Sequence, residues 1–306
     1  MWLFDFSILD KEVGDVNKPT EPLTIIINNI NNIEVLLKTI DGIKDNSSAD
    51  LIHLILFSSI DDDLKSIINP YSKSFKKIDI YKTNKFDYDD LNMNNINTEF
   101  ILIINSGMYF SNKFLAKSLQ YIDNFNLSIL FTPIHYLDSK RKNIFPQLFG
   151  YLKQAIECSL INKNLYSIKK YNRNGFFINK QSFNNFLNEH KETYGSQKYI
   201  VDSDLCIKDI EYNSKNKITS NYFYMIYFGI NCLYFFIITQ FLSVPSIYYL
   251  AIIIIKIIPE LYYIYSYYNR LKIKFPKIEF IIYSIFIPLY MMGRIFTNIV
   301  LREELR

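Results

Sequence analysis

The sequence predicts an α/β fold followed by a membrane region. Within the first two hundred residues, short β-branched apolar runs alternate with segments of helical spacing. This pattern is typical of a mostly parallel sheet with helices on both faces. From Tyr222 onward the apolar residues gather in three runs about as long as a membrane-spanning helix. We therefore expect a lead-in at residues 1–21, an α/β domain over 22–218 and a membrane region over 221–301.

The strands and helices of the α/β domain are predicted from the spacing of apolar residues. Apolar runs predict strands at 23–27, 51–57, 78–81, 100–104, 129–131 and 174–178. Helices are expected from the N-cap Asn32 to Ile40, after the acidic run Asp61–Asp63, and at 114–125, 182–187 and 205–211. Because parallel strands end at a common edge of the sheet, ligands are expected at the polar residues that follow them.

The composition narrows the classes of function. The net charge is +4 and the lysines are scattered, so nothing indicates a nucleic-acid partner. The three cysteines have no CxxC spacing, which argues against a disulfide framework or a zinc site and fits a reducing compartment. His53 lies inside a predicted buried strand and is interpreted as a core residue with a hydrogen-bond partner. The N-terminus has no basic region followed by a long apolar stretch, so no signal peptide is predicted.

Three apolar segments are candidates for transmembrane helices, at about 222–242, 247–268 and 280–300. Basic residues precede the first segment and fill the loop after the second: Lys215, Lys217, Arg270, Lys272, Lys274 and Lys277. The positive-inside rule then makes the first two segments a hairpin in the cytoplasmic membrane, with the α/β domain in the cytosol. The third segment contains Pro288 and Arg294. It either crosses the bilayer, which we favour, or lies at the interface.

Lys256 and Glu260 lie four residues apart near the middle of the second segment, so they share one face of a helix. Charges at this depth often belong to a functional site, such as a transport pathway. The alternative is an internal ion pair buried against neighbouring helices, and we favour this interpretation.

Three stretches at strand ends, and one further along the chain, bear on function. The first strand is followed by Asn31 and Asn32, and the second runs through Phe57-Ser58-Ser59-Ile60 into Asp61. The strand at 100–104 stops at Asn105-Ser106-Gly107. Further along the chain comes Val201-Asp202-Ser203-Asp204-Leu205.

With these elements in this order and a C-terminal membrane hairpin, the chain resembles the family 2 glycosyltransferases. These are membrane-anchored enzymes with the GT-A, or nucleotide-diphospho-sugar transferase-like, fold. The resemblance covers roughly residues 23–210 and rests on the order of the elements, since no single motif is intact. It implies transfer of a sugar, with inversion, from a nucleotide-sugar to a lipid-linked or glycan acceptor at the cytosolic membrane face.

The resemblance also assigns roles to residues. Asp202 matches the catalytic base, with Asp204 and Gly175 on the acceptor side. The nucleotide-sugar would contact the residues that match the donor motifs: Asn31, Ser58, Asp61, Asn105 and Gly107. Two interpretations of the acceptor side stay open, because Asp202 and Asp204 could instead cap the following helix and Gly175 could be a turn residue.

The motifs on the donor side are degenerate. Phe57 and Ser58 stand where the family has two aspartates, and the family's metal-binding Asp-x-Asp falls on Asn105 and Gly107. A Mg²⁺ or Mn²⁺ ion prefers carboxylates, which this turn does not offer, so the ion would have to recruit Asp61, Asp62 or Asp63. Two functions therefore remain: an active glycosyltransferase, or a non-catalytic relative that serves as a membrane scaffold or as the partner subunit of another glycosyltransferase.

Overall fold

The computed structural model describes residues 22–30, 32–45, 49–59, 63–83, 95–136, 150, 154, 157–158, 161–162, 175–188, 196–209, 222–282 and 284. The chain forms two compact units. We call residues 5–142 and 156–213 the sheet unit, and residues 1–4, 143–155 and 214–306 the hairpin unit. Asn31, Asp61, Asp62 and most of the segment 280–300 lie outside the described residues.

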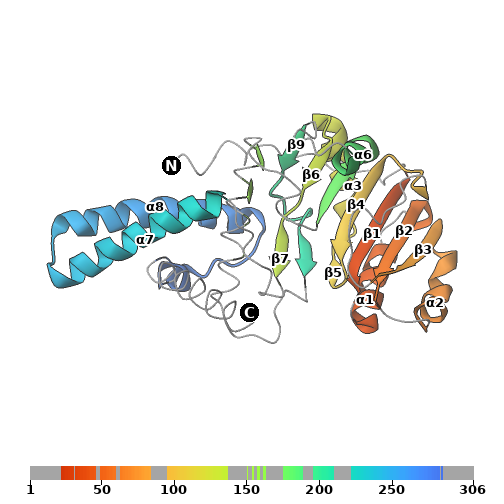
Figure 1. The fold of residues 1–306 in the computed structure, drawn as a ribbon, viewed down its shortest axis with the longest axis horizontal. Coiled ribbons are helices and arrows are strands. Elements are labelled where there is room, and N and C mark those ends of the chain that lie inside the picture. The colour runs from red at the N-terminus through yellow and green to blue at the C-terminus, as the bar shows by residue number, and fades with distance from the viewer. Residues whose placement is uncertain are drawn as a thin grey trace. The chain divides into compact units, whose positions relative to one another are not determined.

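The sheet unit is built on a seven-stranded, mostly parallel sheet (Figure 1). Its strands in spatial order are β3 (Lys77–Lys82), β2 (Ile52–Ser58), β1 (Leu23–Ile30), β4 (Phe100–Asn105), β8 (Phe176–Asn179), β6 (Ile129–Phe131) and β9 (Gln197–Tyr199). β8 runs antiparallel to both of its neighbours, and the other pairs are parallel. The predicted fold class, an α/β protein with a mostly parallel sheet, is confirmed at this level.

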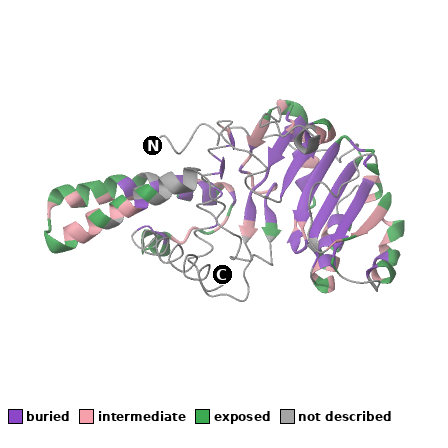
Figure 2. Cartoon of the chain, in the orientation of Figure 1, coloured by how far each residue is buried: buried purple, intermediate pink, exposed green. Residues whose placement is uncertain are grey.

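In the described part of the chain, the helices of the sheet unit include α1 (Ile33–Lys44), α2 (Asp63–Ile68), α3 (Phe114–Phe125) and α6 (Lys180–Asn188), with short 3-10 helices at Ala49–Leu51 and Asn69–Lys73. α1 begins where predicted, because the Asn32 side chain accepts a hydrogen bond from the Glu34 N–H (2.9 Å). Alternate β1 residues such as Ile25 and Ile27 share one core cluster with residues of α1, α2 and α3. β2 is buried along its whole length, so both faces of the sheet are covered there (Figure 2).

A second, three-stranded sheet lies in the same unit, with the order β5 (Met108–Tyr109), β10 (Ile207–Asp209) and β7 (Ile134–Tyr136). β10 corrects the sequence prediction, because the helix expected over 205–211 is wrong. The chain makes a turn at 203–205 and then enters this strand. Buried Ile207 is followed by exposed Lys208, which is the alternation of a strand, and Ile207 donates its N–H to the Pro133 carbonyl (2.9 Å).

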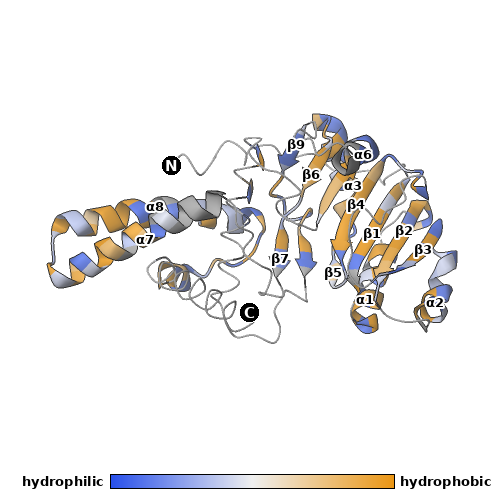
Figure 3. Ribbon diagram, viewed as in Figure 1, coloured by the Kyte–Doolittle hydropathy of each residue, from blue (hydrophilic) through white to orange (hydrophobic). Residues whose placement is uncertain are grey.

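The hairpin unit contains two long helices, α7 (Tyr222–Ser243) and α8 (Ile247–Arg270), joined by a short turn. Of the described helices, α8 is long and apolar enough to cross a membrane, and α7 contributes a shorter apolar stretch, Asn231–Ser243. Both helices are rich in hydrophobic residues (Figure 3). Much of this apolar surface is exposed, including Leu242, Ile247 and Ile255, at 74%, 77% and 68%.

The charged pair of α8 has the opposite placement. Lys256 and Glu260 are buried, their side chains lie 3.1 Å apart, and the Lys256 ammonium lies 5.2 Å from the centre of the Tyr234 ring on α7. The structure thus contains the internal ion pair that the spacing favoured. The charged pair is thus covered, while apolar residues of the same helix such as Ile247 and Ile255 are exposed.

Candidate functional site

The carboxyl ends of β1, β2 and β4 meet at one edge of the large sheet, because the three strands are parallel. Asn28 pairs in register with Asn105, and Ile30 pairs with Ser58. The sequence prediction therefore placed Ser58 and Asn105 correctly at a common edge. This is the edge at which open α/β sheets bind ligands.

The turn after β4 is held to neighbouring elements through its backbone. Ser106 donates its N–H to the Asn28 carbonyl (2.9 Å), and Gly107 donates its N–H to the Thr39 hydroxyl of α1 (2.9 Å). Gly107 has φ +89°, a left-handed conformation that glycine adopts without steric cost. The turn is a fixed feature of the sheet edge.

The described residues of the turn after β4 offer no carboxylate to a divalent metal ion. Asn105 has one neutral carbonyl oxygen, and Gly107 has no side chain. In the part of the chain that the structure describes, no three His, Cys, Asp or Glu side chains come together as a metal site. The residues present do not fit a Mg²⁺ or Mn²⁺ ion at this turn.

The end of β2 is packed with aromatic rings. Phe57, which stands at a position where the family has an aspartate, is buried and stacks on Tyr81 of β3 with ring centroids 5.3 Å apart. Ser58 is also buried, and its carbonyl accepts a hydrogen bond from the Thr83 N–H (2.9 Å). The side chain at this strand end is thus an apolar ring packed against a neighbouring strand.

Asp202 lies at the centre of a polar cluster. Its Oδ2 atom lies 2.7 Å from the Lys117 ammonium and accepts a hydrogen bond from the Tyr121 hydroxyl (3.2 Å). Its Oδ1 atom accepts the N–H of Asp204 (2.8 Å), which forms the turn that replaces the predicted helix. Asp202 therefore caps a turn through Oδ1, and its Oδ2 atom contacts the two donors of α3.

Asp204 completes the cluster from the same turn. Its Oδ2 atom lies 3.0 Å from the Lys117 ammonium, and its carbonyl accepts a hydrogen bond from the Ser111 hydroxyl (3.1 Å). Burial alone would lower the pKa of Lys117, but hydrogen bonds and charges from Asp202 and Asp204 outweigh it and raise the pKa. Lys117 is therefore an ammonium ion at neutral pH.

The small sheet joins this cluster to the turn after β4. β5 begins immediately after Gly107, and its residues Met108 and Tyr109 pair with Asp209 and Lys208 of β10. The chain then enters α3, which carries Lys117. The two parts of the candidate site are thus connected by backbone hydrogen bonds.

Gly175 lies where the two sheets meet. It has φ +81°, it is buried, and its N–H donates to the Ile103 carbonyl of β4 (2.7 Å). An added Cβ atom would lie 3.1 Å from Ile207 Cδ1. The structure thus gives Gly175 a role in packing, and its predicted role toward an acceptor stays a prediction.

Cys206 follows the Asp202 turn and has no role as a nucleophile. Its side chain is buried. This burial raises the pKa of the thiol to about 12, so the thiolate does not form at neutral pH.

Sequence reasoning missed Lys117 and Tyr121. The two residues are four apart on α3 and therefore share a face, which is the signal that could have paired them. Their partner Asp202 lies more than eighty residues further along the chain. No local pattern in the sequence connects the two segments.

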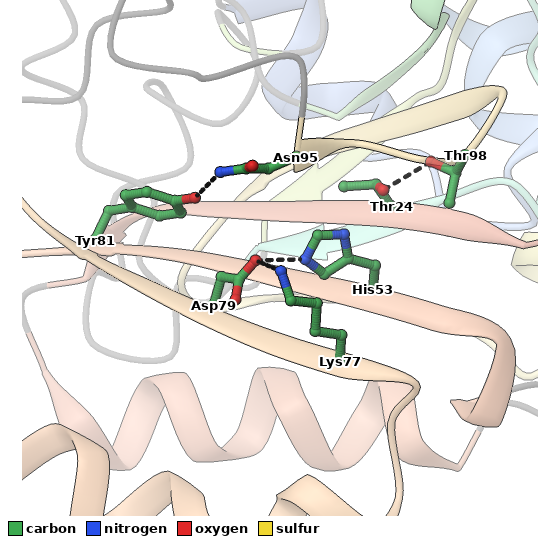
Figure 4. Close-up of polar contacts among 7 residues, drawn as sticks. All are labelled: Thr24, His53, Lys77, Asp79, Tyr81, Asn95 and Thr98. Atoms are coloured by element: carbon green, nitrogen blue, oxygen red, sulfur yellow. Dashed lines mark hydrogen bonds and ion pairs between the residues drawn. The ribbon is translucent and has the colours of Figure 1, made fainter.

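A second polar group lies on β2 and β3 (Figure 4). His53 is buried and its Nε2 atom lies 2.9 Å from Asp79 Oδ2, which also lies 2.5 Å from the Lys77 ammonium. The interpretation of His53 as a core residue with a hydrogen-bond partner is confirmed.

No protein-family model matches the sequence, and no curated protein matches it significantly. Among solved structures, TarS of S. aureus (residues 1–349, in complex with UDP) is 11% identical, and the match covers 40% of this chain and 38% of TarS with a TM-score of 0.34. The chain thus spans about two fifths of that relative. The mannosyltransferase PcManGT of Pyrobaculum calidifontis, in complex with GDP-Man and Mn²⁺, is 11% identical over 94% of this chain and 87% of that chain, with a TM-score of 0.43.

Proposed function

We propose that the chain is a membrane-anchored glycosyltransferase that moves a sugar, with inversion, from a nucleotide-sugar to a lipid-linked or glycan acceptor. One observation carries the proposal. The polar carboxyl edge of β1, β2 and β4 is joined through the β5–β10 pairing to the turn that holds Asp202. Backbone hydrogen bonds thereby connect the proposed donor-binding edge to the turn that carries the candidate base.

In this proposal Asp202 takes the proton of the acceptor hydroxyl while the acceptor oxygen attacks the anomeric carbon and the bond to the nucleoside diphosphate breaks. A base must lie within hydrogen-bond reach of that proton. Oδ2 of Asp202 has two donors and Oδ1 has one. The acceptor hydroxyl therefore approaches Oδ1.

The remaining assignments follow the two sides of the site. On the donor side, Asn31, Ser58, Asp61, Asn105 and Gly107 form the contacts to the nucleotide-sugar. On the acceptor side, Asp204 and Gly175 shape the pocket beside the base.

The membrane anchor is the α7–α8 hairpin, with the sheet unit on the cytosolic side. The exposed apolar residues of both helices and the buried Lys256–Glu260 pair support the anchor. The basic residues after α8, among them Lys272 and Lys274, support the cytosolic side.

A second candidate is a non-catalytic relative that acts as a membrane scaffold or as a subunit of a glycan-assembly complex. Two observations favour it. The buried Phe57 ring replaces a carboxylate at the donor edge, and Lys117 neutralises the candidate base.

Calorimetry with UDP- and GDP-sugars, with and without Mn²⁺, separates the two candidates. The enzyme proposal expects donor binding, and absence of binding at millimolar donor in both conditions would overturn it in favour of the scaffold. Where binding is found, Asp202→Asn should reduce turnover about a hundredfold or more while donor affinity stays unchanged. Asp123→Asn on the exposed side of α3 is the matched control and should keep full turnover.

A further inference from the structure

Two carboxylates converge on one cation in the sheet unit. Asp202 and Asp204 are separated by a single residue, and their Oδ2 atoms lie 2.7 Å and 3.0 Å from the Lys117 ammonium. Both distances are those of charge-assisted hydrogen bonds. The sequence Asp-Ser-Asp at 202–204 thus forms an acidic pair, whereas Asn105–Gly107, the position of the Asp-x-Asp motif by resemblance, has none.

The cation is enclosed by its partners. The side chains of Lys117 and Asp202 are each 12% exposed, and that of Asp204 is 37% exposed. Charges covered to this extent need compensation, because water no longer solvates them fully. Removal of Lys117 would leave two neighbouring carboxylates without a positive charge between them.

We propose that Lys117 is a built-in cation, whose ammonium group takes the position between Asp202 and Asp204 that a divalent metal ion would otherwise occupy. Lys117 is then a positioning residue, which holds the Asp202 carboxylate in place without metal. The part of this inference that concerns catalysis rests on the proposed role of Asp202 as the base. The part that concerns the cation does not depend on it.

The surrounding contacts favour this role over that of an ordinary ion pair. Tyr121, one turn after Lys117 on α3, donates to the same Oδ2 atom of Asp202, and Ser111 donates to the carbonyl of Asp204. These contacts fix both acidic residues to the segment that carries the lysine. Carboxylates and water are ligands that suit Mg²⁺ and Mn²⁺, and one or two protein carboxylates are the number that Mg²⁺ usually takes, so the acidic pair offers protein ligands of the right kind once the lysine is removed.

The test is Mn²⁺ binding by the full chain in detergent, measured by calorimetry and electron paramagnetic resonance with the metal alone. Four proteins are compared: the native chain, Lys117→Ala, Lys117→Ala with Asp204→Asn, and Lys113→Ala. Lys113 lies one turn earlier, at the N-cap of α3, and is exposed, so it serves as the matched control. Thermal unfolding with and without Mn²⁺ is recorded for each protein.

Lys117→Ala should bind Mn²⁺ at least about tenfold more tightly than the native chain, because two carboxylates become available to the metal. Mn²⁺ should raise the melting temperature of this variant and leave that of the native chain unchanged. The added Asp204→Asn change should abolish the gain, and Lys113→Ala should behave as the native chain does.

Two results would overturn the proposal. One is Mn²⁺ binding by the native chain as tight as that of Lys117→Ala. The other is a folded Lys117→Ala protein that gains no affinity. Where Lys117→Ala fails to fold even with Mn²⁺, Lys117→Gln retains the length of the side chain, and its failure to gain affinity for Mn²⁺ also counts against the proposal.

These measurements use no nucleotide-sugar, so they are independent of the proposed activity. If the native chain binds no nucleotide-sugar, the glycosyltransferase proposal is wrong, but the Mn²⁺ comparison still tests the proposal for Lys117. Where turnover is found, Mn²⁺ should restore part of the activity lost in Lys117→Ala, and no such rescue is expected for Asp202→Asn.

Discussion

At the scale of single residues, Asp79 connects two neighbouring strands through its side chain. Burial alone would raise the pKa of Asp79, but the bonds from Lys77 and His53 outweigh burial and hold the pKa below its usual value of 3.8 (Figure 4). A carboxyl group with a depressed pKa in the folded state stabilises the fold above its unfolded pKa. This contribution is lost as the pH falls through the lower, folded value.

We therefore expect the stability difference between the native chain and Asp79→Asn to depend on pH. The difference in the free energy of unfolding should have its full size above about pH 5 and should become smaller as the pH falls below about 4. Urea unfolding at a series of pH values measures it. Lys77→Met removes one donor and should make the pH-dependent part smaller, whereas a difference that stays constant down to about pH 3 would contradict the assignment.

Gly175 has a backbone conformation that leaves little room for substitution. Its φ of +81° opposes a side chain, and so does the distance of only 3.1 Å that would separate an added Cβ atom from Ile207 Cδ1. Gly175→Ala should lower the free energy of unfolding by about 1–3 kcal/mol.

The control for this prediction is Gly42→Ala in the interior of α1. There the added Cβ meets the Tyr109 Cβ at an ordinary contact distance of 3.4 Å. Because alanine is favoured over glycine within a helix, this variant should be neutral or up to about 1 kcal/mol more stable. Equal effects of the two substitutions in thermal unfolding would show that neither the positive φ nor the Ile207 contact opposes a side chain at position 175.

At the scale of elements, α1 depends on its N-cap. The Asn32 side chain accepts the Glu34 N–H, one of the donors that a helix start leaves without an intrahelical partner. Asn32→Ala should cost about 1 kcal/mol of unfolding free energy, and Asn32→Asp should retain most of it because aspartate also caps. Chemical denaturation compares the two, and an alanine variant as stable as the aspartate variant would exclude the cap.

The elements also show how far the sequence could predict the fold. The strands of five or more apolar residues and the amphipathic helices 32–40 and 114–125 were predicted within a few residues, because their periodicity is local. β5 and β10 are two and three residues long, too short to carry a period. The prediction of a helix at 205–211 failed because long-range pairing with β5 and β7 decides that segment.

At the scale of the whole molecule, the candidate site divides in the same way. The common edge of Ser58 and Asn105 could be predicted, since parallel strands end together. The partners of Asp202 could not be predicted, because Lys117 and Tyr121 come from a helix that meets it only through the tertiary fold. A pattern in the sequence indicates where a carboxylate lies along the chain. Which cation lies beside it is decided by packing between segments that are far apart in the sequence.

The hairpin unit offers the last prediction, since the Lys256–Glu260 pair of α8 is buried while apolar residues such as Ile247 and Ile255 are exposed. Lys256 and Glu260 are buried and lie 3.1 Å apart, so either residue alone would be an uncompensated buried charge. Lys256→Leu or Glu260→Leu should each lower stability in detergent by about 3–5 kcal/mol, whereas the double substitution should restore it almost completely.

Thermal unfolding of the detergent-solubilised chain, together with the yield in the membrane fraction, measures both effects. Lys274→Leu is the matched control, because this lysine is exposed and follows the same helix. Additive losses in the double variant would mean that the two residues contribute to stability separately, which would contradict a coupled ion pair. Recovery in the double variant would identify the pair as a structural device that lets two charged residues lie within an apolar hairpin.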